Sequence, residues 1–218
     1  MSFLYPVTEL ASAIQETKTP WGITIYRTTY TPLSDLHFDR IVELIGALLK
    51  ENIRTWKNSD DDEQGTAYTI LKENYQPIVM NDRSTFDGMT FEDARVHQQS
   101  YIELPEGTAG ETTGRPWTNE NFFIVVDEEV VQTLAELCDQ VTPAQLQEGS
   151  RDDKTFFNYA NRRKWWVKVA ETELWEEDDK GWMKCSIFML WNLWSDMNGE
   201  EGMSTWEAMA MRSGVYTG

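Results

Sequence analysis

A lysine flanked by aromatic residues is the most suggestive chemical feature of the sequence. Alternation along two predicted β-strands places Tyr26, Tyr30, Trp166 and Lys168 on the same side of a sheet. An ammonium group on a covered sheet face costs free energy unless it is paired or used, so Lys168 is a candidate for binding an anionic or enolate-like oxygen. The alternative is an edge lysine that reaches solvent. We expect Lys168 and Tyr26 to be catalytic, and Tyr30 and Trp166 to bind substrate.

A second candidate group lies around residue 97, where the spacing suits proton transfer. Asp93, His97 and Tyr101 are four residues apart on a predicted helix and therefore share one face. In a catalytic role, the Asp93 carboxylate would orient the imidazole of His97, which would move the proton. The alternative is a row of polar side chains that faces solvent.

Three tryptophans in residues 182–197 form the third candidate feature. The segment is apolar on nearly every side of a helix, so a helix there must be covered on more than one side. In one interpretation Trp182, Trp191 and Trp194 line an apolar pocket and bind substrate. In the other they belong to a plain core or to a dimer interface, where Trp and Met are enriched.

The sequence carries no signature of nucleotide, dinucleotide or zinc chemistry. It has no glycine-rich phosphate loop, no Gly-x-Ser-x-Gly, no His-Glu-x-x-His and no Cys-x-x-Cys. A His/Cys metal site would need nearly all of His37, His97, Cys138 and Cys185 to converge. We therefore expect no cofactor and assign no metal ligand, although a magnesium ion held by carboxylates alone stays open.

Strands and helices must alternate to position these groups. Runs of β-branched and aromatic residues predict strands, and apolar residues at helical spacing predict helices. The expected strands are residues 21–30, 77–80, 122–126 and 165–174, and the expected helices are residues 35–53, 66–74, 90–102, 128–138, 182–197 and 204–214.

The order of these elements predicts an α+β protein with a ferredoxin-like βαββαβ sandwich. We expect a peripheral N-terminal arm at residues 1–20, a single domain at residues 21–218, a helical and looped insertion at about residues 82–119, and two extra C-terminal helices. Two of the long helices would cover one face of the sheet. The Trp-rich helix would roof the other face and leave a cleft.

The charge balance restricts the partners and the compartment. The chain has 37 acidic and 19 basic residues, which gives a net charge of −18. Repulsion from phosphate groups argues against nucleic acid and anionic membrane surfaces as partners. Because there are two cysteines, no signal-peptide pattern and no wholly apolar run longer than Phe122–Val126, we expect a cytoplasmic protein.

Several landmarks make the chain similar to a group of fungal (ascomycete) proteins without an assigned activity. The matching residues are Trp21-Gly22, Ile25 to Tyr30, Phe86 to Gly88, Val125 to Glu129, Trp165 to Val169, Gly181 to Lys184, and Val215-Tyr216. They span most of the chain, and none of them forms a catalytic motif. The resemblance implies a fungal, intracellular, single-domain protein and supplies no catalytic residue.

Two functions of different kinds are compatible with these features. The first is a cofactor-independent enzyme, an isomerase, cyclase or lyase acting on a hydrophobic small molecule of fungal specialised metabolism. In it Lys168 would stabilise negative charge, and His97 with Asp93 would move a proton. The second is a non-enzymatic interaction module that uses its acidic surface or an aromatic homodimer interface. Loss of a dimer on Trp191→Glu would support the second.

Overall fold

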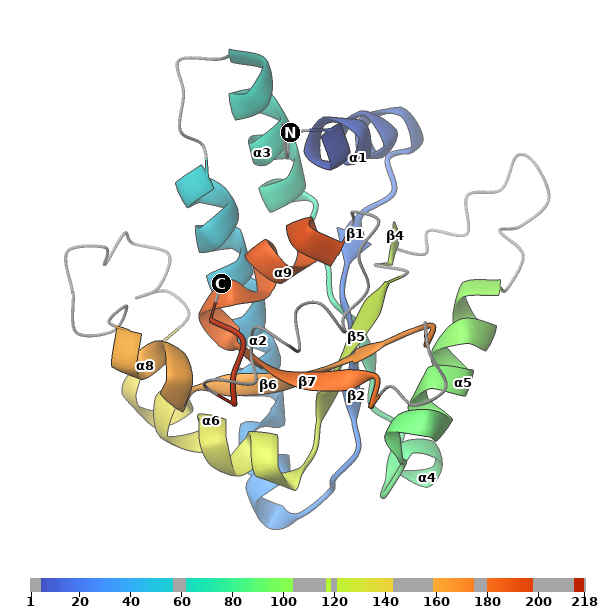
Figure 1. Cartoon of the computed structure of the whole chain (residues 1–218), viewed down its shortest axis with the longest axis vertical. Helices are drawn as coiled ribbons and strands as arrows, with labels where there is room; N and C mark the ends of the chain where they lie inside the picture. The colour runs from blue at the N-terminus through green and yellow to red at the C-terminus, as the bar shows by residue number, and fades with distance from the viewer. Residues whose placement is uncertain are drawn as a thin grey trace.

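A five-stranded mixed β-sheet with helices on both faces forms the centre of the molecule (Figure 1). The computed structural model describes residues 5–56, 62–103, 117–118, 121–142, 159–174, 180–197 and 214–217. The sheet consists of β2 (Thr24–Arg27), β3 (Ile78–Met80), β5 (Phe122–Val126), β6 (Trp166–Glu171) and β7 (Trp182–Ser186), and a separate two-stranded sheet joins β1 (Trp21–Gly22) to β4 (Trp117–Thr118).

Helices connect most of these strands. They are α1 (Tyr5–Thr17), α2 (Pro32–Trp56), α3 (Asp62–Glu73), α4 (Arg83–Phe86), α5 (Phe91–Glu103), α6 (Glu128–Gln140), α8 (Tyr159–Lys164), the short 3-10 turn η2 (Ile187–Met189) and α9 (Leu190–Met197). In Figure 1, α4 and α5 (green) lie on one side of the sheet, and α2 (blue), α6 (yellow) and α8 (orange) lie on the other.

The strand order is β3-β2-β5-β6-β7, with β2 parallel to both of its neighbours. The pairs β5–β6 and β6–β7 are antiparallel. This arrangement confirms an α+β fold but not the ferredoxin-like order, in which neighbouring strands are antiparallel. The physical reason is the connection from β3 to β5. It contains α4 and α5, so it is a crossover that returns the chain parallel to β2 and β3, whereas the ferredoxin-like order needs a direct antiparallel connection at this point.

The elements with the clearest patterns form where the sequence predicts them. Helix α2 buries its apolar stripe, which includes Leu44, Ile45 and Leu48. Strand β5 is buried at every residue, as its continuous apolar run requires. Asp127 begins α6 as an N-cap, because its side chain accepts a hydrogen bond of 3.1 Å from the backbone N–H of Val130.

The expected helix at residues 182–197 is wrong in its first half. Trp182–Ser186 is strand β7, a helix begins only at Leu190, and the turn η2 lies between them. The side chains of β7 alternate in burial, with Trp182 and Lys184 less buried than Met183 and Cys185. A two-residue period over only five residues is easily mistaken for an apolar helix when a true helix follows it.

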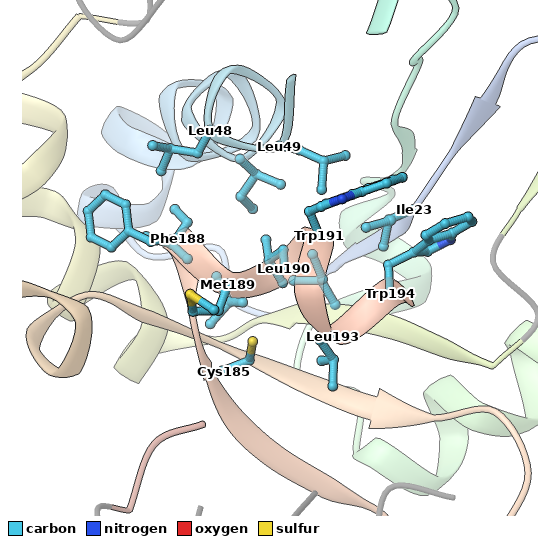
Figure 2. Packing of buried hydrophobic residues seen from close by; sticks show 14 of the residues in the cluster. Ile23, Leu48, Leu49, Cys185, Phe188, Met189, Leu190, Trp191, Leu193 and Trp194 are labelled. Atoms are coloured by element: carbon cyan, nitrogen blue, oxygen red, sulfur yellow. The ribbon is translucent and has the colours of Figure 1, made fainter. Parts of the chain in front are cut away.

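The Trp-rich segment therefore does not roof the second face of the sheet. Figure 2 shows Trp191 and Trp194 of α9 beside Ile23, near Leu48 and Leu49 of α2. These residues belong to the main core, which also includes the inner stripes of α2 and α6. The second face is instead covered by α4 and α5, within the segment expected to be an insertion, and its small core consists of Tyr26, Tyr30, Phe86, Ala94, Phe123, Val125 and Ala170.

Two further expected segments can be compared with the structure only in part. Within residues 1–20, α1 packs against α3 and buries Val7, Ala11 and Ile14 in the main core. The expected last helix at residues 204–214 lies almost wholly outside the described residues.

One glycine joins the sheet to α5. Gly181 has a φ of +64° and immediately precedes β7. A Cβ atom there would lie 2.5 Å from Nη2 of Arg95 and 2.2 Å from the Leu174 side chain. The left-handed conformation and the close approach of Arg95 therefore both require glycine at this position.

Trp191→Ala is expected to lower the free energy of unfolding by about 3–5 kcal/mol, since it removes a ring that is 1% exposed from the main core. Urea denaturation monitored by far-ultraviolet circular dichroism measures the change. The matched control is Leu36→Ala, where the side chain is 73% exposed and the cost should be about 0.5 kcal/mol or less. Equal losses in the two variants would contradict the placement of α9.

Candidate functional site

Tyr26 and His97, two of the predicted catalytic residues, meet between β2 and α5. The Tyr26 Oη atom lies 2.9 Å from Nδ1 of His97 and donates a hydrogen bond of 3.1 Å to Oε1 of Gln98. The Nε2 amide of Gln98 in turn donates to Oγ1 of Thr24, at 3.2 Å. A chain of hydrogen bonds thus runs from the strand, through the helix, to the imidazole ring.

Helix α5 contacts the sheet mainly through polar groups. Its buried residues are Ala94, Arg95 and Gln98. Arg95 donates from Nε to the Glu171 carbonyl oxygen at 2.9 Å and from Nη2 to the Gly181 carbonyl oxygen at 3.3 Å. These bonds fix the distance of α5 from the sheet and its rotation about its own axis. They therefore determine where His97 lies relative to Tyr26.

His97 stands at the boundary between the small core and solvent. Tyr26 and Gln98 are fully buried, whereas His97 is half-buried. The imidazole packs edge-to-face against Phe86, with ring centroids 5.2 Å apart, and against Tyr26, at 5.6 Å. One edge of the ring is therefore fixed by the protein, and part of the ring is open to solvent.

Burial determines the protonation of this pair. It raises the pKa of Tyr26 well above its usual 10, and the neighbouring Tyr101 adds to the shift. Burial also lowers the pKa of His97 below its usual 6.5. At neutral pH both side chains are therefore uncharged.

These contacts select one tautomer of His97. Because the Tyr26 hydroxyl donates its proton to Gln98, the Tyr26 oxygen is left to accept a hydrogen bond from Nδ1–H of His97. In the neutral ring the lone pair is then on Nε2. Within the described residues, Nε2 has no hydrogen-bond partner.

Asp93 does not orient His97 in this structure. Its carboxylate accepts a hydrogen bond of 2.7 Å from Oγ1 of Thr90, and its backbone N–H donates a hydrogen bond of 3.1 Å to this Thr90 oxygen. The bond from the Asp93 N–H to the Thr90 hydroxyl is the N-terminal cap of α5. Asp93 thus contributes to the position of His97 through the start of the helix.

Lys168 is paired with two carboxylates. Its Nζ atom binds Oδ2 of Asp127 and lies 2.7 Å from Oε2 of Glu129, whose other oxygen lies 2.7 Å from Nζ of Lys184. Burial opposes the charged form of Lys168, but the bonds to Asp127 and Glu129 together outweigh it and raise the pKa above 10.5. The ammonium charge is already neutralised, so a substrate oxygen would have to compete with both carboxylates.

The predicted substrate-binding residues divide between the two faces of the sheet. Tyr30 belongs to the small core with Tyr26, and Trp182 packs against that core, stacked on Phe91 with ring centroids 4.7 Å apart. Trp166, Trp191 and Trp194 belong to the main core. Strand register also aligns Tyr26, Val125 and Lys168 on one side of the sheet. The structure therefore brings Tyr26, Tyr30, Lys168, His97 and Trp182 to the second face.

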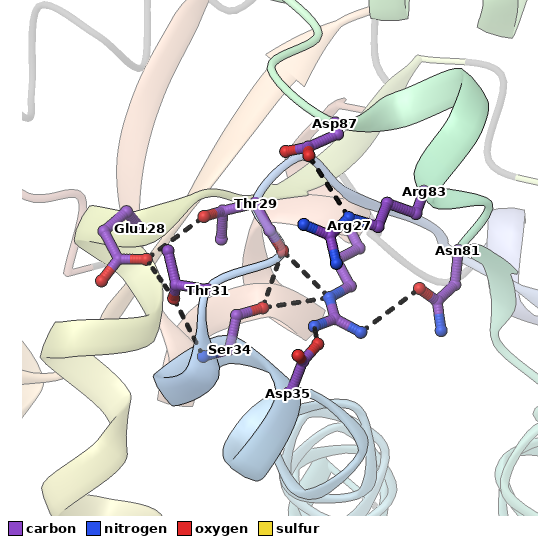
Figure 3. A network of polar contacts seen from close by, with 9 residues as sticks. All are labelled: Arg27, Thr29, Thr31, Ser34, Asp35, Asn81, Arg83, Asp87 and Glu128. Carbon is purple, nitrogen blue, oxygen red and sulfur yellow. Dashed lines mark hydrogen bonds and ion pairs between the residues drawn. The ribbon is translucent and has the colours of Figure 1, made fainter.

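Sequence reasoning missed a buried polar network at the carboxyl ends of β2, β3 and β5 (Figure 3). Arg27 is 7% exposed, and its Nε donates to the Thr29 carbonyl oxygen and to Oγ of Ser34, each at 3.0 Å. The guanidinium also pairs with Asp35 and lies 4.3 Å from the ring centroid of Tyr30. The signal for it was an arginine at the end of a buried strand, followed by a threonine-rich turn and a helix start.

Glu128 completes this network from the first turn of α6. Its Oε2 accepts hydrogen bonds from Oγ1 of Thr31 at 2.7 Å and from Oγ1 of Thr29 at 3.2 Å. The bond from Thr31 and a bond from Gln132 are the main causes that lower the pKa of Glu128, and the bond from Thr29 adds to them. Ligands of open α/β sheets often bind at this edge, but here the principal groups satisfy one another and join α2 to α6.

Other candidate chemistries find little support in the described residues. There, no group of three or more His, Cys, Asp or Glu side chains could hold a metal ion. Cys138 and Cys185 are buried, and burial raises the pKa of the Cys138 thiol to about 12 and that of Cys185 further. Among these residues there is also no helix long and apolar enough to span a membrane.

Comparison with known proteins gives no match: no family model, no curated protein and no solved structure is significantly similar to this chain. The resemblance to fungal proteins therefore stays a prediction. The candidate site rests on its own geometry.

Tyr26→Phe is expected to destabilise the fold by about 1–3 kcal/mol, because it leaves Oε1 of Gln98 and Nδ1–H of His97 without their partner. Tyr30→Phe is the matched control, since the buried Tyr30 hydroxyl has no hydrogen-bond partner in the described structure. Its removal should be neutral or slightly stabilising. Urea denaturation of the two variants measures the difference, and a costlier Tyr30→Phe would contradict the hydrogen-bond chain.

Proposed function

We propose that this chain is a cofactor-independent enzyme of the isomerase, cyclase or lyase type, which moves a proton on a hydrophobic small molecule. The observation that carries the proposal is the His97 ring, whose Nδ1 is bonded to Tyr26 while Nε2 has no hydrogen-bond partner among the described residues. A base held by one nitrogen and free at the other is the usual arrangement for proton transfer by histidine.

The neutral partner of His97 suits a base that works near neutral pH. In many enzymes a carboxylate holds the histidine and favours its charged form. Here the partner is the uncharged Tyr26 hydroxyl, and burial keeps the imidazole neutral. When Nε2 takes a proton, the bond from Nδ1 to Tyr26 is retained and becomes charge-assisted.

The surroundings of His97 favour an apolar substrate. The ring contacts Phe86, and the same small core is flanked by Met80, Met89, Phe91 and Trp182, which are partly buried. Half-buried apolar side chains around one polar atom are typical of small-molecule sites. A hydrophobic molecule with one acidic C–H bond would match this composition.

The residues take different roles in this proposal. His97 is the catalytic base, and Tyr26 is a positioning residue, because it is fully buried and acts through the imidazole. Phe91 and Trp182 would contact substrate. Lys168 has a structural role, since it ties β6 to α6 through Asp127 and Glu129.

A non-enzymatic interaction module is the second candidate function. The observation that favours it is a short segment of the chain, residues 214–217, docked on the outer edge of β7. Edges of this kind bind extended peptides in many proteins. The two functions use different surfaces, so a test of His97 bears only on the first.

The free base can be tested with 5-nitrobenzisoxazole, which opens to a nitrile and a yellow phenolate when a base removes its ring C–H proton. The protein is expected to accelerate this opening more than an equal concentration of free imidazole. His97→Gln should lower the rate by about tenfold or more. His37→Gln is the matched control, because His37 is the other histidine and is 7% exposed, and its rate should be unchanged.

The dependence of this rate on pH provides a further check. Because burial lowers the pKa of His97, the rate should be retained to a lower pH than for an exposed histidine and should fall only as pH drops through the lowered pKa. Tyr26→Phe should alter the tautomer seen by ¹⁵N nuclear magnetic resonance. Full activity in His97→Gln would exclude His97 as the base.

A further inference from the structure

The outer edge of β7 pairs with residues 214–217 at a single β-bridge, between Cys185 and Tyr216. The backbone N–H of Ser186 donates to the Tyr216 carbonyl oxygen at 2.9 Å, and the Tyr216 N–H donates to the Lys184 carbonyl oxygen at 2.8 Å. The pairing is parallel and places Tyr216 beside Cys185. Two backbone hydrogen bonds thus satisfy groups of an edge strand that would otherwise lack these partners.

Side chains give this contact its selectivity. Val215 and Tyr216 are 6% and 3% exposed and belong to the main core. The Tyr216 hydroxyl donates a hydrogen bond of 2.6 Å to Oδ2 of Asp196, which projects from α9. The strand edge therefore recognises an extended backbone, and the carboxylate of α9 recognises a tyrosine.

These features are those of strand addition, in which main-chain bonds provide affinity and alternate side chains provide specificity. The contacts would be identical if the docked segment came from another molecule. Only the connection between segment and groove would differ, and a connected segment is favoured by an effective concentration in the millimolar range. The segment known to fit the groove is one of this chain, so a second copy supplies the matching ligand.

We propose that the groove between the edge of β7 and Asp196 also accepts residues 214–217 of a second copy of this chain, so that two copies exchange these strands. Such an exchange yields a dimer without any new contact surface. It would provide the homodimer that the sequence suggested, but by a route other than Trp191, which is buried in the core.

Complementation between two full-length variants tests the exchange. Tyr216→Ala keeps the groove and spoils the strand, whereas Asp196→Ala keeps the strand and spoils the groove. A mixture unites the intact groove of the first with the intact strand of the second. Native mass spectrometry of the equimolar mixture is expected to show mixed dimers, at twice 25.3 kDa, several-fold more abundant than the dimers of either variant alone.

Circular dichroism first establishes that Tyr216→Ala and Asp196→Ala fold. If either variant does not fold, the experiment uses Tyr216→Phe and Asp196→Asn instead. A mixture in which dimers are no more abundant than in the separate variants, up to millimolar concentration, overturns the proposal. The peptide Ser-Gly-Val-Tyr-Thr-Gly is the second probe. Binding of this peptide to Tyr216→Ala without mixed dimers also overturns exchange between copies and indicates a foreign peptide as the partner.

Discussion

The burial of β2 between two parallel strands is the constraint on which the rest of the structure depends. Ile25 on one face and Tyr26 on the other are both fully buried, so each face of this strand needs its own cover. Parallel neighbours require long crossovers, and these crossovers supply the helices. The connection through α2 covers the first face, and the connection through α4 and α5 covers the second.

The helices on the two faces of the sheet are attached by different interactions, and this difference produces the candidate site. Helix α2 is held by a wide apolar stripe, whereas α5 is held largely by Arg95, Gln98 and their hydrogen bonds. A helix docked through polar groups can place an imidazole half in the core and half in solvent. His97 takes this position, and its bond to Tyr26 gives the ring one orientation.

Local patterns were sufficient for much of the fold. Strand β5 and helix α6 were predicted within two residues from a continuous apolar run and the cap at Asp127. The failure was Trp182–Ser186, where apolar residues suit a strand or a helix equally and only the pairing with β6 decides. The parallel order of the sheet was also beyond the sequence, because pairing direction depends on which face each crossover covers.

The sequence allowed the residues of the candidate site to be predicted, but not the contacts between them. Tyr26 and His97 were both singled out, yet each was assigned a different partner, Lys168 for Tyr26 and Asp93 for His97. Their meeting needs α5 to lie across β2, which no local pattern indicates. The Arg27 network was missed for a partly similar reason: Ser34 and Asp35 are close to Arg27 in the chain, but Asn81 comes from a distant segment.

Gly181 has a consequence that extends beyond its own turn. Its carbonyl oxygen accepts hydrogen bonds both from the Glu171 N–H of β6 and from Arg95 of α5, so the hairpin and the helix share one anchoring atom. A larger residue at 181 would push Arg95 away and rotate α5, and thereby change the basicity of His97 without touching it. The residues tolerated at position 181 should therefore depend on the residues at positions 95 and 97, so these three positions should change together in natural variants.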